Sequence, residues 1–197
     1  MEDSQQHDAD DLAGVIAGDP HAIDRWYRRD HPAVWRLAFG LLGERAEADD
    51  LAQDAMLQLH DKLTGGERPR SYRAWRDTLV LNLCRDRARR RASRRHAEAG
   101  AGGPRALELA PASSAPLERS DVQRVLRVAL EALPERERAA FVLRELEGHS
   151  TAHVAAVLEI GESSVRSLLT LARRRLRDLL GDRLDPRPLA AREGRDG

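Results

Sequence analysis

The sequence predicts an all-α protein of two small helical domains joined by a flexible linker. Its 197 residues are enough for one or two domains, each with its own small core. Apolar residues recur at three- and four-residue steps in both halves, which is the spacing of a helix with one buried face. Between the halves, residues 96–120 are rich in glycine, proline and serine and poor in large apolar residues. Such a composition is typical of a flexible linker.

The first domain, residues 10–95, opens with three predicted helices, of which the first ends at Gly18. The second begins at Asp19-Pro20, which supplies a capping residue and a first-turn proline. The third follows His31-Pro32 and ends at Gly43, because glycine commonly occupies the position just after a helix.

A fourth predicted helix, Glu44–Leu63, carries acidic residues on its exposed side. Residues 44–61 hold six acids against the single Arg45. Apolar residues four positions apart define the buried face, namely Leu51, Ala55, Leu59 and Leu63. The opposite face presents Asp50, Gln53, Asp54 and Leu57. A solvated acidic helix face is the ordinary explanation of this pattern.

A long helix from about Tyr72 to Arg95 carries a cluster of arginines in its second half. Residues 85–95 hold seven arginines against the single Asp86, although the whole chain has a formal net charge of zero. We expect charge of this density to meet phosphate or an acidic partner. The acidic and basic segments together predict two different partners, one basic and one polyanionic.

The second domain, residues 121–181, ends in a predicted helix-turn-helix. A helix over residues 121–133 precedes the stretch Leu133–Leu180, which is predicted to form three short helices and a longer basic one. Ser150 is expected to cap one short helix, and residues 159–162 to make the turn into the last. The apolar stripe of that last helix consists of Val165, Leu169, Ala172, Leu176 and Leu179. Its arginines lie off the stripe, which suits a DNA major groove. Residues 182–197 are predicted to be a disordered tail.

The single cysteine and the scattered histidines argue against an enzyme and against a metal centre. Cys84 cannot form an intramolecular disulfide and is predicted to be a small buried residue. His149 and His153 are four residues apart with no third ligand nearby, so both are predicted to be surface residues. We expect no catalytic residue and no cofactor. No apolar run approaches the roughly 20 residues of a membrane span, so a soluble cytoplasmic protein without membrane insertion is expected.

Three segments, in the order of the chain, resemble a sigma-70 family RNA polymerase sigma factor of the small, two-domain, extracytoplasmic-function type. The segment ERAEADDLAQD, Glu44–Asp54, is similar to region 2.2 of that family. Tyr72–Trp75, with Asn82 and Asp86 beyond it, is similar to regions 2.3 and 2.4, and Leu133–Leu180 is similar to region 4. The resemblance implies a non-enzymatic subunit that directs core polymerase to specific promoters and initiates transcription.

The resemblance also implies a role for each segment. Region 2.2 docks on the clamp helices of the polymerase's largest subunit, which assigns polymerase binding to Asp50, Gln53, Asp54 and Leu57. Regions 2.3 and 2.4 capture the melted minus-ten element with a flipped base in the loop before Tyr72. The implied contacts are Tyr72, Arg73, Trp75, Asn82, Arg85, Asp86, Arg89 and Arg90. Region 4 reads the minus-thirty-five duplex, which implies contacts from Ser163, Ser164, Arg166, Ser167, Thr170, Arg173 and Arg174.

The implied partners are core RNA polymerase, through its clamp helices and flap, promoter DNA, and an anti-sigma protein that covers both domains. Three residues of the segment similar to region 4 depart from the family pattern. Glu159 stands where the turn usually has glycine, and Leu168 and Leu171 stand where relatives often carry arginine toward DNA. Leucine cannot hydrogen-bond to a base edge, although it can contact a thymine methyl. Recognition of the minus-thirty-five element is therefore apolar, weak or replaced by protein contacts.

Two other functions stay open at this point. A stand-alone helix-turn-helix regulator would use the acidic helix and the Trp75 segment as scaffold only. A sigma-like protein that acts mainly through protein contacts would explain Leu168 and Leu171.

Overall fold

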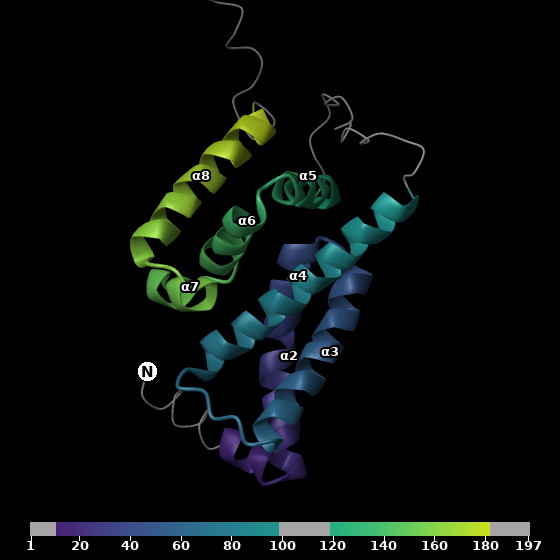
Figure 1. Ribbon diagram of the computed structural model, residues 1–197, viewed down its shortest axis with the longest axis vertical. Coiled ribbons are helices and arrows are strands. Elements are labelled where there is room, and N and C mark those ends of the chain that lie inside the picture. Colours follow the sequence, from purple (N-terminus) through teal and green to yellow (C-terminus); the bar gives the residue numbers. More distant parts are fainter. Residues whose placement is uncertain (1–10, 99–118, 182–197) are drawn as a thin grey trace, which may run out of the picture.

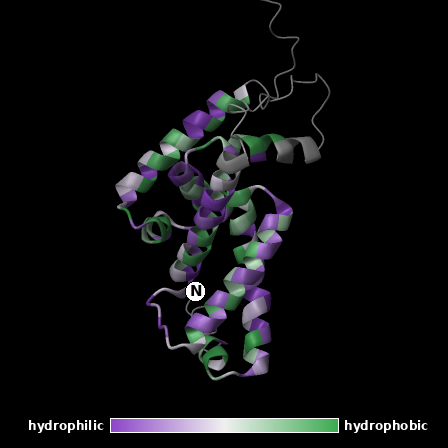
Figure 2. Ribbon diagram, turned by 45° about the vertical axis from the view of Figure 1, so that its right-hand side comes forward, coloured by the Kyte–Doolittle hydropathy of each residue, from purple (hydrophilic) through white to green (hydrophobic). Residues whose placement is uncertain are grey.

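The computed structural model describes residues 11–98 and 119–181, and every regular element within these ranges is helical (Figure 1). The predicted tail lies outside the described residues, as does most of the predicted linker. The helices carry apolar residues on one side and polar residues on the other (Figure 2). This amphipathic pattern is the one that predicted helices from the sequence.

A short helical segment at residues 11–16 leads into α2 (Pro20–Leu42). The carboxylate of Asp19 caps α2 by accepting a hydrogen bond from the backbone N–H of His21 at 3.0 Å. Gly43 ends the helix with a φ of 73°, a left-handed conformation that favours glycine.

The prediction of two helices separated at Pro32 was wrong, because α2 runs through Pro32 without a break. A proline inside a helix removes one hydrogen bond and costs about 3 kcal/mol. The cost is offset because the apolar face is buried on both sides of the proline, with Trp26 before it and Val34 and Leu37 after it. Burial of a large apolar side chain contributes about 1.5–3 kcal/mol.

The helices α3 (Arg45–Thr64) and α4 (Tyr72–Glu98) complete the N-terminal domain. The predicted apolar row of α3 is confirmed, since Leu51, Ala55 and Leu59 are fully buried and Leu63 nearly so. Residues 65–71 form the connection to α4. The helix α4 extends to Glu98, a few residues into the segment that was predicted to be linker.

The C-terminal domain contains α5 (Arg119–Glu131), α6 (Glu135–Phe141), the π-helical segment η1 (Val142–Leu146), α7 (Thr151–Leu158) and α8 (Glu162–Leu180). The cap predicted at Ser150 is confirmed, because its side chain accepts a hydrogen bond from the backbone N–H of His153 at 3.1 Å.

The predicted stripe of α8 is correct except at its end. Leu180 is buried with Leu176 against α5, whereas Leu179 is 38% exposed. Each residue turns the helix by about 100°, so Leu180 lies about 40° around the helix from Leu176, whereas Leu179 lies about 60° from it.

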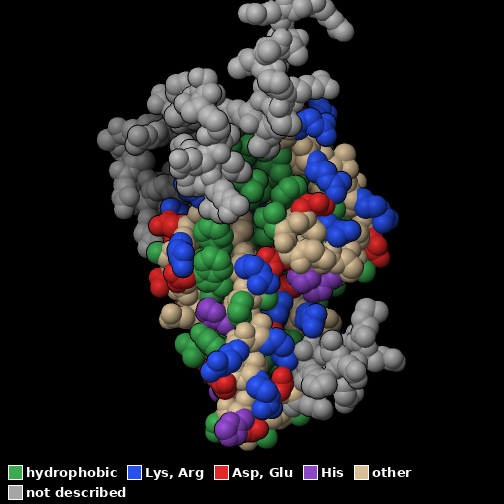
Figure 3. Space-filling model, turned by 180° about the vertical axis from the view of Figure 1, so that it is seen from behind, with side chains coloured by type: hydrophobic (Ala, Val, Ile, Leu, Met, Phe, Trp, Pro, Cys, Tyr) green, Lys and Arg blue, Asp and Glu red, His purple; other side chains and the backbone are tan. Residues whose placement is uncertain are grey.

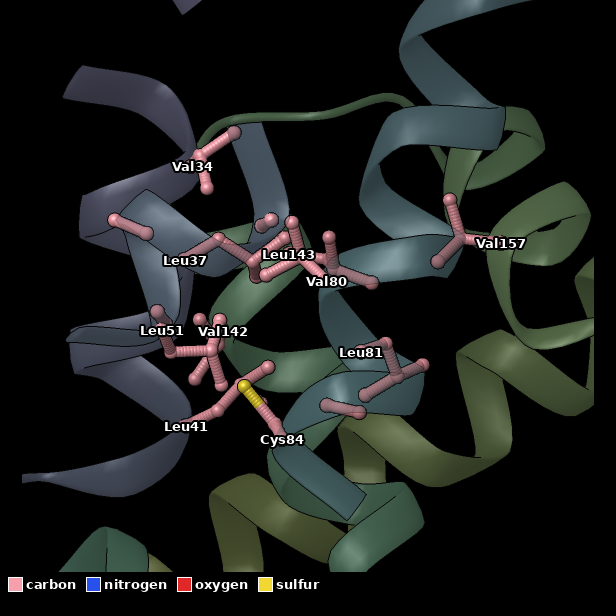
Figure 4. Close-up of a cluster of buried hydrophobic side chains, with 14 of the residues drawn as sticks. Val34, Leu37, Leu41, Leu51, Val80, Leu81, Cys84, Val142, Leu143 and Val157 are labelled. Atoms are coloured by element: carbon pink, nitrogen blue, oxygen red, sulfur yellow. The ribbon is translucent and has the colours of Figure 1, made fainter. Parts of the chain in front are cut away.

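One apolar core joins the two domains. Side chains of α2 and α4, including Leu37, Val80 and Leu81, share a cluster with Val142 and Leu143 of η1 and Val157 of α7. Figure 4 shows Leu37, Val80 and Leu143 meeting near the centre of this cluster. The sequence predicted both domains but not their packing against each other.

Polar contacts lie at the edge of this interdomain core. Among them, Arg138 donates to the carbonyl oxygen of Leu41 at 3.1 Å, Arg85 pairs with Glu135 at 2.5 Å, and Arg36 pairs with Glu147 at 3.2 Å. Each of these two ion pairs joins an exposed side chain to a half-buried one, and pairs so close to the surface contribute about 0–1 kcal/mol each. The apolar cluster therefore provides most of the interdomain stabilisation.

Cys84 belongs to this interdomain core, and its prediction as a small buried residue is confirmed. The side chain is 4% exposed and lies beside Leu41 and Val142 (Figure 4). Burial raises the pKa of the Cys84 thiol to about 12. Because the thiolate is the reactive form, the packed arrangement protects Cys84 from thiol reagents.

Replacing Gly40 with leucine should separate the domains. A Cβ at position 40 would lie 2.7 Å from Cγ1 of Val142, closer than packed carbons approach. We expect Gly40→Leu to speed the reaction of Cys84 with a thiol reagent at least tenfold while the far-ultraviolet circular dichroism stays unchanged. Ala46→Leu, which adds the same side chain on an exposed part of α3, is the control. Equal Cys84 reactivity in wild type and Gly40→Leu would contradict the packed arrangement.

Glu159 holds a strained backbone conformation in the turn before α8. Its φ of 54° and ψ of 47° are left-handed, and it is the only non-glycine residue with positive φ in the described part of the chain. We expect Glu159→Gly to raise the free energy of unfolding by about 1 kcal/mol, because a side chain costs about that much in this conformation. Denaturant titration measures the change. Glu159→Ala keeps the strain and should give no such gain.

Candidate nucleic-acid interface

The four residues predicted to bind polymerase share one exposed face of α3. Asp50, Gln53, Asp54 and Leu57 all lie opposite the buried row of that helix. Leu57 is 65% exposed, the most exposed of the large apolar side chains in the described residues. An apolar side chain on a helix face that also carries acids is suited to a partner surface with apolar and basic side chains.

The acidic and basic segments partly neutralise each other within the N-terminal domain, which the sequence analysis did not predict. Arg87 of α4 pairs with Asp54 of α3 at 2.6 Å. Arg91 pairs with both Glu44 and Glu47 at 3.1 Å. Figure 3 likewise shows basic and acidic side chains interspersed over one face of the molecule. The helices α3 and α4 are therefore held together by charge as well as by apolar packing.

Most of the predicted minus-ten residues lie on the outer side of α4. Asn82, Asp86, Arg89 and Arg90 are exposed, and Arg89 pairs with Asp86 at 2.9 Å. Arg85 is half-buried because Glu135 of the C-terminal domain covers it. Arg73 is exposed near the start of the helix.

Tyr72 and Trp75 hold the loop before α4 in place. The Tyr72 hydroxyl accepts a hydrogen bond from the Trp26 indole at 2.6 Å, and burial raises the pKa of Tyr72 above its ordinary value. The Trp75 indole donates to Glu67 in the loop at 3.2 Å. Arg68 donates to the carbonyl oxygen of Leu63 at 2.9 Å. Tyr72 thus points toward protein, and Trp75 is half-buried.

All seven residues predicted to contact the minus-thirty-five duplex are exposed on α8: Ser163, Ser164, Arg166, Ser167, Thr170, Arg173 and Arg174. The hydroxyls of Ser167 and Thr170 donate to carbonyl oxygens one turn back, at 3.1 and 3.0 Å. Arg173 pairs with Glu145 of η1 at 2.6 Å.

The two leucines that depart from the family pattern have different surroundings. Leu168 is half-buried and packs against the shared core, whereas Leu171 is 43% exposed. The expectation that both face DNA is therefore wrong for Leu168. Its apolar character is explained by packing, and Leu171 alone remains on the exposed face.

A buried ionic cluster was missed by the sequence analysis. Arg76 bridges Asp30 of α2 at 2.6 Å and Asp77 at 2.9 Å, and all three side chains are almost fully buried. Burial alone would raise the pKa of Asp77, but the hydrogen bond from His153 and the charge of Arg76 hold that pKa below its ordinary value. A signal was present in the spacing, because Asp30 falls four residues from both Trp26 and Val34 in a buried row.

The prediction that His149 and His153 are surface residues without a third ligand was also wrong. Nε2 of His153 lies 2.7 Å and Nε2 of His149 lies 3.2 Å from Oδ2 of Asp77. Both rings are partly buried and stack on each other. The third residue is 72 positions away from His149 in sequence, so only the fold could reveal it.

Comparison with known proteins identifies the family. A family model described as sigma-70 region 2 matches residues 26–94, and one described as sigma-70, region 4 matches residues 123–176. The ECF RNA polymerase sigma factor SigM of Mycobacterium tuberculosis is 36% identical over 177 residues, covering 90% of this chain and 86% of SigM. This chain belongs to the ECF RNA polymerase sigma factors. It is a subunit of the class that directs core polymerase to promoters.

Other relatives agree with this assignment. The sigma factor SigE of Mycolicibacterium smegmatis is 32% identical, covering 83% of this chain and 64% of SigE. The resemblance drawn from the sequence is confirmed. Sigma factors as a class are non-enzymatic initiation factors, which agrees with the expectation that this chain is not an enzyme.

Solved structures confirm the all-α fold of this sigma factor. RpoE of Bartonella quintana, solved with the anti-sigma factor NepR, aligns with a TM-score of 0.62 and 25% identity, covering 80% of this chain and 95% of RpoE. CnrH, solved with the cytosolic domain of CnrY, aligns with a TM-score of 0.66 at 23% identity, covering 88% of this chain and 97% of CnrH. None of the helices in the described residues is both long and apolar enough to cross a membrane.

Proposed function

We propose that this sigma factor binds core polymerase through the exposed face of α3 and binds promoter DNA through the outer faces of α4 and α8. The observation that carries the polymerase assignment is the position of Leu57. It is 65% exposed on the same face as Asp50 and Asp54, on a helix whose other side is buried. We assign this face to the clamp helices of the largest subunit, and the C-terminal domain to the flap.

The exposed positions of the α4 and α8 residues support the two DNA assignments. On α4, Asn82 and Arg90 are open to solvent and can meet an unstacked strand. On α8, Arg166 and Arg174 lie off the buried stripe and can meet phosphates of a duplex.

In the packed arrangement the two domains cannot contact both promoter elements at once. Elements named minus ten and minus thirty-five are centred roughly 25 base pairs apart, which is roughly 85 Å of straight duplex. The longest helix of this protein, α4, has 27 residues and is about 40 Å long. The two domains share one core, so we propose that they separate when promoter DNA and polymerase are bound.

An anti-sigma protein is a proposed regulator of this arrangement. RpoE of Bartonella quintana was solved in complex with the anti-sigma factor NepR. A protein that binds both domains of this chain would favour or prevent their separation according to the arrangement that it binds better.

Charge and polarity changes on α3 test the polymerase interface. Asp50→Arg and Leu57→Glu are surface changes, so the helix should still fold while the contact is lost. We expect each to lower run-off transcription with purified core polymerase, and co-purification with it, at least tenfold. Asp24→Arg, a charge reversal at an exposed position of α2, should leave both transcription and co-purification unchanged. Normal transcription by Asp50→Arg and Leu57→Glu would refute the α3 assignment, and tight duplex binding without polymerase would favour a stand-alone regulator.

Arginine replacements at the two leucines of α8 test its DNA face. We expect Leu171→Arg to strengthen promoter binding and to steepen its salt dependence by about one phosphate contact, because Leu171 is exposed. Leu168→Arg should instead lower the free energy of unfolding by about 1–3 kcal/mol, because Leu168 packs against the core. Binding measured across salt concentrations, with denaturant titration, separates the two effects. An unchanged salt slope in Leu171→Arg would favour action through protein contacts.

A further inference from the structure

Two histidines of the C-terminal domain and one aspartate of the N-terminal domain converge between the domains. His149 lies in the turn before α7, His153 lies in the first part of α7, and Asp77 lies on α4. One ligand atom from each residue lies within 4.8 Å of the other two, and no other group of this kind occurs in the described residues. The three side chains therefore form one cluster built from both domains.

The distances in the cluster are close to those that a tetrahedral zinc ion requires. Ligands about 2.0–2.1 Å from zinc lie about 3.3 Å from one another. Oδ2 of Asp77 is 3.2 Å from Nε2 of His149 and 2.7 Å from Nε2 of His153. The two rings are stacked at 4.0 Å with an angle of 15°, and Nε2 of each lies near the same carboxylate oxygen. On zinc binding the separation at His153 would widen by about 0.6 Å and the rings would tilt so that both nitrogens face the ion.

Contacts behind Asp77 orient it as a ligand. Its Oδ1 accepts a hydrogen bond from Arg76 at 2.9 Å, which leaves Oδ2 for the histidines. Arg76 also donates to Asp30 at 2.6 Å, and Asp30 in turn pairs with Arg29 at 2.7 Å. Asp77 is therefore held from behind, with Oδ2 directed at the two histidines. Supporting hydrogen bonds of this kind fix the ligands of metal sites and raise metal affinity.

Both histidine rings are partly open to solvent. The side chains of His149 and His153 are 21% and 15% exposed. A cavity of about 230 Å³ borders His149, and Asp30, Glu147 and the arginines Arg29, Arg36, Arg73 and Arg76 also line it. Zinc sites that have three protein ligands take water in the fourth position.

We propose that Asp77, His149 and His153 bind one divalent first-row transition-metal ion, with zinc the best fit, and that the ion fastens α7 to α4. Two imidazoles and one carboxylate suit zinc better than magnesium or calcium, which prefer oxygen ligands. Because the ligands come from both domains, a bound ion stabilises the packed arrangement over the separated one. By stabilising the packed arrangement, zinc would also restrain promoter use. This consequence rests on the proposed function, whereas metal binding itself does not.

Calorimetry on the full chain, stripped of metal by a chelator, tests the site directly. We expect one zinc ion to bind per chain, no binding of magnesium, and a rise in Tm of roughly 5–10 °C at a hundredfold excess over Kd. His149→Gln and His153→Gln should each weaken zinc binding at least tenfold and reduce the Tm shift. His60→Gln is the matched control, because His60 lies 3.5 Å from Asp61 without a third ligand.

Hydrogen exchange tests whether the ion joins the domains. Zinc should slow amide exchange in α7 and in the middle of α4 of the wild type, and should not do so in His153→Gln. Absence of stoichiometric zinc binding, binding that survives both histidine replacements, or unchanged exchange would each overturn the proposal. These measurements use neither polymerase nor promoter DNA, so their outcome is independent of the proposed function.

Discussion

The packing of η1 against α2 holds the two domains together, and most other features of the structure depend on it. Val142 is fully buried at a point where Gly40 has no side chain to obstruct it. The same contact brings Glu135 beside Arg85 and His153 beside Asp77. Exposed ion pairs alone contribute too little to hold two domains. The apolar contact therefore provides most of the free energy that holds the domains together, and the polar contacts at its edge fix how the domains are oriented.

In the packed arrangement the proposed binding faces are open to solvent, but they lie closer together than the two promoter elements do. The outer side of α3 and the exposed side of α8 are both available to partners. A partner that engages only one of them can bind without disturbing the core. Under the proposed function, promoter DNA would engage α4 and α8 together and would favour a separated state. Such a ligand shifts the equilibrium by the difference between its affinities for the two states.

Local patterns predicted the elements well, because each depends on residues within a few turns. The four-residue rows of α3 and the cap at Ser150 follow from spacing and side-chain chemistry alone. The errors occurred where distant segments decide the outcome. The helix α2 stays intact at Pro32 because its apolar face is buried before and after the proline, and Leu168 packs against the shared core. Likewise, His149 and His153 contact Asp77 of α4, a helix that the linker separates from them in sequence.

The contact between Gly40 and Val142 also has a consequence for synthesis on the ribosome. At about 5–20 residues per second, Val142 is made roughly 5–20 s after Gly40. During this interval the N-terminal helices can fold around their own core, but the apolar surface formed by Leu37, Val80 and Leu81 lacks its cover. The newly made domain must remain soluble with that surface exposed. A chaperone or an early-binding partner would find it available while the chain is still growing.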